Sequence, residues 1–248
     1  MNTRTILRGT VFLTVILNGL TILAAETSAP PEPGDLRAAG KVDFQVSCEP
    51  AVQDEFVRGV ALLHSFFYEE ARRVFTAVAE KDPTCAMAQW GIGMTWWHPI
   101  WTPPTADEMS AGKAAAEKAM AMTNVSDRER LFISALNAYY NAPESSAQSE
   151  VGQSCHGPVG PRDRVITYEK AMRKLYEKYP DDVEAQTFYA LALLSVGYAT
   201  PTDTTLANQK QAAQLLEKLW KKNPQHPGVA HASHDDGLQD PATGDRSE

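Results

Sequence analysis

Two segments of the chain repeat at an interval of about 34 residues, and this repeat constrains the fold more than any other feature of the sequence. A shift by that interval places Gly93 on Gly59 and His98 on His64. Small residues where helices touch, aromatic residues between them and a closing proline are typical of a helix-turn-helix unit. One such hairpin cannot bury its apolar face alone. The sequence therefore predicts several helical hairpins stacked on one another.

The remaining sequence divides into further helices and loops. The segment 142–160, which contains several glycines and prolines, is predicted to be a loop. Thr105, with Glu108 three residues later, is predicted to cap the helix that follows a proline-containing interruption. We expect an all-α fold, a short right-handed α-solenoid of about four helical hairpins. Periodicity, caps and prolines predict helices at about 51–65, 67–81, 85–98, 105–122, 127–141, 162–179, 182–197 and 207–224.

The first residues of the chain read as an export signal. Arg4 and Arg8 precede an apolar run that ends in Leu-Ala-Ala, so residues 1–25 are predicted to be a signal peptide cleaved after Ala25. An uncleaved N-terminal anchor is the alternative. The protein is accordingly expected to be exported, to a periplasmic or secreted location.

The segments on either side of the helices have compositions typical of solvated chain. Residues 26–47 are rich in Ala, Pro, Glu and Gly and are predicted to be a disordered linker. Residues 233–248 have almost no apolar side chains and are predicted to be a disordered tail. The helical repeat domain is therefore expected to span residues 48–232.

The net charge and the absence of catalytic motifs exclude several classes of function. The formal net charge is -8, which argues against nucleic acid or an anionic membrane surface as a partner. The sequence has no HExxH, P-loop, GxSxG or Rossmann glycine pattern. We therefore expect neither enzyme activity nor a cofactor.

Two of the three cysteines are placed where they could form a disulfide. Cys48 and Cys85 each precede the first helix of a repeat. Those helices stack roughly in parallel, so their starts are neighbours, and an exported compartment allows oxidation. We predict a Cys48–Cys85 disulfide, with two buried free thiols as the alternative. Cys155 is left unpaired in the predicted loop.

The helical hairpins resemble the tetratricopeptide repeat (TPR) superfamily over about 48–230. The phrases FVRGVALLHSFFYEEARRVF, DPTCAMAQWGIGMTWWHPIW and HPGVAH also look like a narrower group of bacterial exported TPR proteins. In that group the chain continues through further hairpins after HPGVAH. The resemblance therefore implies a truncated or frame-shifted product, with a genuine short form as the alternative, and self-association through an uncapped C-terminal end.

The resemblance also implies a binding function. TPR arrays present the inner faces of their first helices as a concave groove. On that register His64 and His98 occupy equivalent positions, Phe56 and Trp90 form a second pair, and Trp97 lies beside His98. The implied function is a protein- or peptide-binding scaffold or assembly factor, in which an extended segment contacts these five residues. The alternative interpretation is that they are core residues.

Histidines near the end of the chain suggest a second class of function. His226, His231 and His234 are followed by two aspartates, and imidazole and carboxylate are competent metal ligands. The sequence after them breaks a helix, so no metal site is predicted. A metal- or redox-linked binding protein that uses histidines and Cys155 remains the alternative function. A fragment whose functional site lies in a missing C-terminal part is a further alternative.

Overall fold

The computed structural model describes residues 40–142, 152–154, 157–159 and 162–234, all within the compact unit Leu36–Glu248. The predicted signal peptide, most of the predicted linker and nearly all of the predicted tail lie outside these residues.

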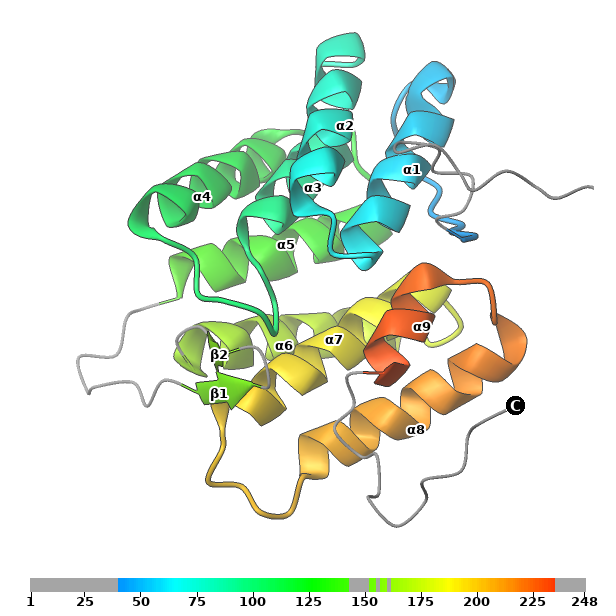
Figure 1. Ribbon diagram of the computed structural model, residues 1–248. Coiled ribbons are helices and arrows are strands. Elements are labelled where there is room, and N and C mark those ends of the chain that lie inside the picture. The colour runs from blue at the N-terminus through cyan, green and yellow to red at the C-terminus, as the bar shows by residue number, and fades with distance from the viewer. Residues whose placement is uncertain (1–39, 143–151, 155–156, 160–161, 235–248) are drawn as a thin grey trace, which may run out of the picture. The chain divides into compact units, whose positions relative to one another are not determined.

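The described chain is built from α-helices, which confirms the all-α class (Figure 1). Consecutive helices pack against each other from α1 to α8, and α9 packs against α8. The predicted loop contains two short strands, β1 (Gly152–Ser154) and β2 (Gly157–Val159), which pair antiparallel. None of the helices in the described ranges is long and apolar enough to cross a membrane. The helices are α1 (Gln53–His64), α2 (Tyr68–Lys81), α3 (Ala86–Trp96), α4 (Ala106–Ala121), α5 (Asp127–Asn141), α6 (Arg162–Lys178), α7 (Val183–Ala199), α8 (Ala207–Lys222) and α9 (Pro227–His234).

Helices α4 and α5 begin at side-chain caps that the sequence supplies. The Thr105 hydroxyl accepts a hydrogen bond from the backbone N–H of Glu108, and the Glu108 carboxylate accepts one from the backbone N–H of Thr105. Ser126 and Glu129 form the same reciprocal pair at the start of α5. Each pair satisfies backbone donors that the first turn of a helix leaves without partners.

Phe75 fills the seam between the first two hairpins. An added Cβ at Gly59 of α1 would lie 2.7 Å from the Phe75 ring, and one at Gly91 of α3 would lie 2.5 Å from it. Both positions therefore require the absence of a side chain, so that the Phe75 ring of α2 can pack against the backbones of α1 and α3.

The odd-numbered helices face one another in the interior. α1 packs against α3 and α9, α3 against α5, and α7 against α9. Trp90 of α3 joins this set, because its ring centroid lies 5.6 Å from that of Phe132 on α5 and 5.4 Å from that of Phe188 on α7. The first helices of the hairpins therefore bury their inner faces against each other.

The part of the predicted linker that the structure describes is docked against the helices. Residues 41–48, which we call the strap, lie extended against the helices, and the Phe44 side chain is fully buried. Lys41 N–H donates to the carbonyl of Gln225, just ahead of α9. The prediction for residues 40–47 is thus corrected: the composition is that of solvated chain, but one aromatic and two valine side chains pack against the core, and helix side chains bond the backbone of this segment.

Candidate metal centre

Three ionisable side chains from three separate parts of the chain meet in the core. Nε2 of His64 lies 2.8 Å from Oε2 of Glu184, and Nε2 of His226 lies 2.7 Å from Oε1 of the same carboxylate. None of the three residues is more than 4 % exposed. Their possible ligand atoms all lie within 4.8 Å of one another.

The ends of three helices position these side chains. His64 lies in the last turn of α1, and Glu184 lies in the first turn of α7. Asp182 caps α7 by accepting a hydrogen bond from the N–H of Ala185, and this helix N-terminus favours a negative charge nearby. His226 directly precedes α9 in a turn, where its N–H donates to the carbonyl of Asn223.

The hydrogen bonds of His226 identify its tautomer. Its Nδ1 accepts a hydrogen bond from the backbone N–H of Val229 at 3.3 Å. A ring nitrogen that accepts carries no proton, so the proton of a neutral imidazole must be on Nε2. His226 therefore donates that Nε2–H to the Glu184 carboxylate.

Gly228 allows α9 to approach α1 closely. A Cβ at this position would overlap Nδ1 of His64 and lie 2.7 Å from its Cγ and 2.8 Å from Cγ2 of Thr187. A side chain here would therefore push the His64 ring out of its place.

The centre holds a buried negative charge. Burial raises the pKa of Glu184, but the charges and hydrogen bonds of His64 and His226 outweigh it and lower that pKa to about 2. Burial lowers the pKa of His64, against the attraction of Glu184. Among the described residues, the ion-pair partners of this carboxylate are the two histidines. With neutral imidazoles, the cluster carries one uncompensated negative charge.

A small pocket adjoins the centre. Its volume is about 20 Å³, enough for a water-sized molecule. Phe66, one of its wall residues, has a left-handed backbone (φ 61°), a conformation that is strained for an aromatic residue. Residues of the wall include Leu63, His64, Phe66, Leu191, Gly228 and Ala232.

The side chains present fit a divalent transition-metal ion. Two imidazoles and one carboxylate form a set that zinc sites use, and they leave a fourth position for water or another ligand. The same set with open positions also suits ferrous iron. Alkaline-earth ions prefer all-oxygen sites, so they fit this centre poorly.

The residues predicted to line an exposed groove are mostly buried in the core. Phe56 and Trp90 are fully buried, Trp97 is 2 % exposed and His64 is 4 % exposed. His98 is half-buried, with its ring centroid 4.7 Å from that of Tyr68. The expectation of an open groove at these positions is therefore corrected, because the strap and α9 cover the inner faces of the odd-numbered helices.

Two of the three members of the centre carry a prediction from the sequence, neither of them for this centre. His64 is predicted to line a groove, and His226 is grouped with the histidines that follow it. Glu184 carries no prediction. The sequence does contain a signal for Glu184, because it is the only charged residue in a helix that is otherwise apolar on every face. A buried charge needs a partner.

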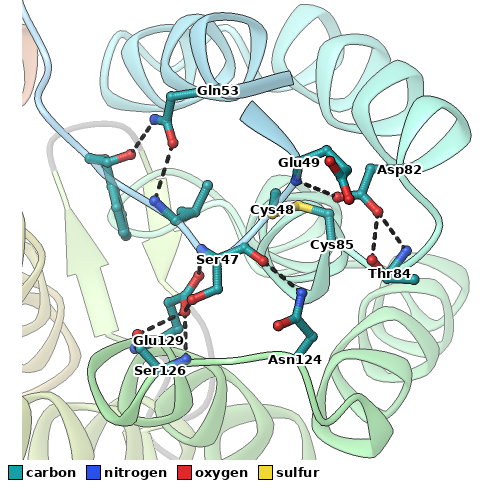
Figure 2. Close-up of a disulfide and its surroundings, with 12 residues drawn as sticks. Ser47, Cys48, Glu49, Gln53, Asp82, Thr84, Cys85, Asn124, Ser126 and Glu129 are labelled. Carbon is teal, nitrogen blue, oxygen red and sulfur yellow. Dashed lines mark hydrogen bonds between the residues drawn. A yellow bond between two sulfur atoms is a disulfide. The ribbon is translucent and has the colours of Figure 1, made fainter. Parts of the chain in front are cut away.

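The structure contains a disulfide between Cys48 and Cys85, the pair that the sequence predicted (Figure 2). The cysteines are 37 residues apart in the sequence. Beside it, the carboxylate of Asp82 accepts hydrogen bonds from the N–H of Glu49 and from the N–H and hydroxyl of Thr84. The disulfide and the Glu49 bond hold the end of the strap against the corner between α2 and α3, and the Thr84 bonds fix the Asp82 carboxylate in that corner.

Comparison with known proteins gives no relative. No protein-family model, curated protein or solved structure matches this chain.

Proposed function

We propose that this protein binds a divalent transition-metal ion through His64, Glu184 and His226. The observation that carries the proposal is a buried carboxylate held between two imidazole nitrogens at 2.7 and 2.8 Å. Such a charge is costly in a core unless a cation compensates it. A divalent ion supplies that compensation and uses all three side chains at once.

The geometry requires only a small opening to admit the ion. In a tetrahedral zinc site with ligands at about 2.0–2.1 Å, neighbouring ligand atoms lie about 3.3 Å apart. The nitrogen–oxygen pairs of the centre are about half an ångström closer than this, because they share protons.

Metal binding at this centre competes with protonation of the imidazoles. Nε2 of His226 must give up its proton to become a ligand, and that proton moves to Nδ1, because a neutral imidazole keeps one ring N–H; a histidine protonated on both nitrogens cannot bind the ion. In the metal-bound form Nδ1 of His226 carries the proton, so it no longer accepts the long hydrogen bond from the Val229 N–H. Affinity should therefore fall as the pH is lowered.

Zinc titration of the untagged protein tests the proposal. We expect one equivalent of zinc by calorimetry and a melting temperature that rises with zinc concentration. Glu184→Ala and His226→Ala should abolish binding, while His98→Ala, which removes a histidine outside the centre, should not. Absence of stoichiometric zinc, or equal binding by Glu184→Ala, would contradict the proposal. His231→Ala distinguishes this centre from the neighbouring histidine on α9.

The finer architecture and the location are also proposals. We infer a right-handed TPR-like solenoid, supported by the stacking of consecutive helices and the residues shared by the first two hairpins. An exported protein is supported by the disulfide, because such bonds persist mainly in oxidising compartments. Detection of the processed chain in an extracytoplasmic fraction would test this.

A second candidate function is the binding of an extended peptide by the inner faces of the odd-numbered helices. The specific observation in its favour is that an extended segment already lies there, namely the strap.

A further inference from the structure

Three side chains of metal-binding types gather at the corner between the first two hairpins (Figure 2). Cys48 ends the strap, Asp82 is the C-cap residue of α2, and Cys85 is the N-cap residue of α3. The sulfur atoms of the two cysteines and a carboxylate oxygen of the aspartate all lie within 4.8 Å of one another. The fold thus assembles a second set of metal-binding side chains, which shares no residue with the centre described above.

Asp82 is held by groups other than the sulfur atoms. Its carboxylate accepts hydrogen bonds from the N–H of Glu49 at 2.8 Å, from the N–H of Thr84 at 2.9 Å and from the Thr84 hydroxyl at 2.7 Å. Burial raises the pKa of Asp82, but these hydrogen bonds outweigh it and lower that pKa. The carboxylate is therefore ionised, as a metal ligand must be.

The charge of Asp82 has no cationic neighbour. The residue is only 3 % exposed. The donors to its carboxylate are neutral groups, and it forms no ion pair within the described ranges. A charge removed from water is normally paired with an opposite charge or bound to a metal ion. A cation placed between this carboxylate and the two sulfur atoms would supply the missing compensation.

The three side chains form a zinc-binding set once the S–S bond is open. Thiolate sulfur and carboxylate oxygen are both zinc ligands, at about 2.3 Å and about 2.0–2.2 Å from the ion, and a tetrahedral site has room for a water as well. With these bond lengths the two sulfurs lie about 3.8 Å apart, and each lies about 3.5 Å from the oxygen. The ligand atoms are thus already gathered at about the spacing of a metal site.

The sulfur of Cys48 is the one that a reductant reaches. Cys48 is half-buried, whereas Cys85 is 1 % exposed. Glu49 and Thr84 beside them are exposed, so the corner lies just beneath the surface. A thiolate opens a disulfide by attacking a sulfur that it can reach. An attacking dithiol therefore forms its mixed disulfide with Cys48 and releases the thiol of Cys85.

We propose that Cys48, Cys85 and Asp82 form a redox-controlled zinc site, which is closed while the disulfide is present and is opened by a dithiol. The dithiol gives two electrons and two protons to the S–S bond and itself becomes a cyclic disulfide. The ion then displaces the protons of the two thiols and binds both thiolates and the carboxylate. Sulfur–metal bonds replace the S–S bond, so the end of the strap stays joined to the corner. The inference does not rest on the centre at His64.

The test compares zinc binding by the oxidised and the reduced full-length protein. The reduced form is prepared with a phosphine, which becomes the phosphine oxide, and is desalted under argon. We expect the reduced protein to bind one more equivalent of zinc by calorimetry than the oxidised protein does, whatever the oxidised protein binds at the His64 centre. Cobalt in place of zinc should give thiolate-to-metal charge-transfer absorption in the near ultraviolet, which imidazole and carboxylate ligands do not produce.

Single substitutions identify the ligands. Cys48→Ser should lose the additional equivalent of zinc and weaken the charge-transfer absorption. Asp82→Asn keeps the size of the side chain but removes its charge, so it should weaken zinc binding by the reduced protein at least about tenfold and retain the absorption. Cys155→Ser removes the third cysteine of the chain and is the matched control. It should change neither quantity.

Circular dichroism keeps the test decisive if the reduced protein unfolds without metal. Zinc should then restore more helical signal to it than to Cys48→Ser/Cys85→Ser, which keeps the His64 centre but has no thiolates at this corner. No difference between these two proteins, equal zinc stoichiometry of the folded oxidised and reduced forms, or unchanged affinity in Asp82→Asn would overturn the proposal. Release of the additional zinc when an oxidised dithiol is added back would support it.

Discussion

Replacement of Gly228 by alanine is the sharpest perturbation of the centre that leaves all three ligands in the sequence. The new Cβ would lie 2.7 Å from Cγ of His64, whereas carbon atoms pack at about 3.5–4.0 Å. The imidazole must therefore withdraw by about 1 Å. Its Nε2, now 2.8 Å from the Glu184 carboxylate, would then be beyond hydrogen-bonding distance.

The expected cost combines two opposing effects. Overpacking of a well-filled site costs about 1–3 kcal/mol, and alanine in a helix regains up to about 1 kcal/mol relative to glycine. Gly228→Ala should therefore lower the free energy of unfolding by about 1–2 kcal/mol. Zinc affinity should fall at least about tenfold, since one of three ligands is displaced.

The assay is a zinc titration paired with urea denaturation, and Gly93→Ala is the matched control. A Cβ at Gly93 would meet the flexible end of Leu136 at 2.8 Å, away from the centre. It should change stability without changing zinc affinity. Wild-type zinc affinity in Gly228→Ala, with the variant folded, would refute the geometry argued for His64.

Three further results are expected. The Cys48→Ser/Cys85→Ser double variant should lose about 4 kcal/mol of stability in guanidinium denaturation, the chain-entropy value for a loop closed by cysteines 37 residues apart. In EDTA, wild-type stability should fall as the pH drops below 6.5, because burial lowers the pKa of His64 and the unfolded chain binds that proton first. The free energy of unfolding should fall by a further ~3 kcal/mol between pH 4.5 and about 2, because Glu184 is protonated in the unfolded chain but stays ionised in the folded protein. Urea titrations of Glu184→Gln should not show this second loss. Arg128→Ala should cost about 1–2 kcal/mol, because it loses both the cation–π contact with the Phe44 ring of the strap and the ion pair with Asp182, and it should increase proteolysis of the strap; an exposed arginine of α2 is the comparison.

The helices could be predicted because their signals are local. The helix start capped by Thr105 and the helix ends next to prolines are predicted within a few residues of their positions in the structure. The disulfide followed from two helix starts that stack side by side. In each case the information lies within one helix or between two consecutive hairpins.

The centre and the strap could not be predicted because their partners are distant. His64 and Glu184 are 120 residues apart, and the periodicity of a helical sequence does not indicate which distant helix ends lie close together. Phe44 lies in a segment whose average composition is that of solvated chain. Composition averaged over the segment therefore does not indicate that one of its side chains is buried. The centre and the docking of the strap both depend on how the odd-numbered helices pack against each other.

Closure of the first helix onto the last described ones has a consequence for folding. In an open repeat array each unit contacts only its neighbours, so unfolding can begin at either end and spread. Here His64 of α1 is bonded to Glu184 of α7, which is bonded in turn to His226 ahead of α9. The first and the last described helices are therefore tied to each other through α7. Amide hydrogens in α1 should exchange only with global unfolding, and folding should be slower than the helical content alone suggests, because long-range contacts must form first.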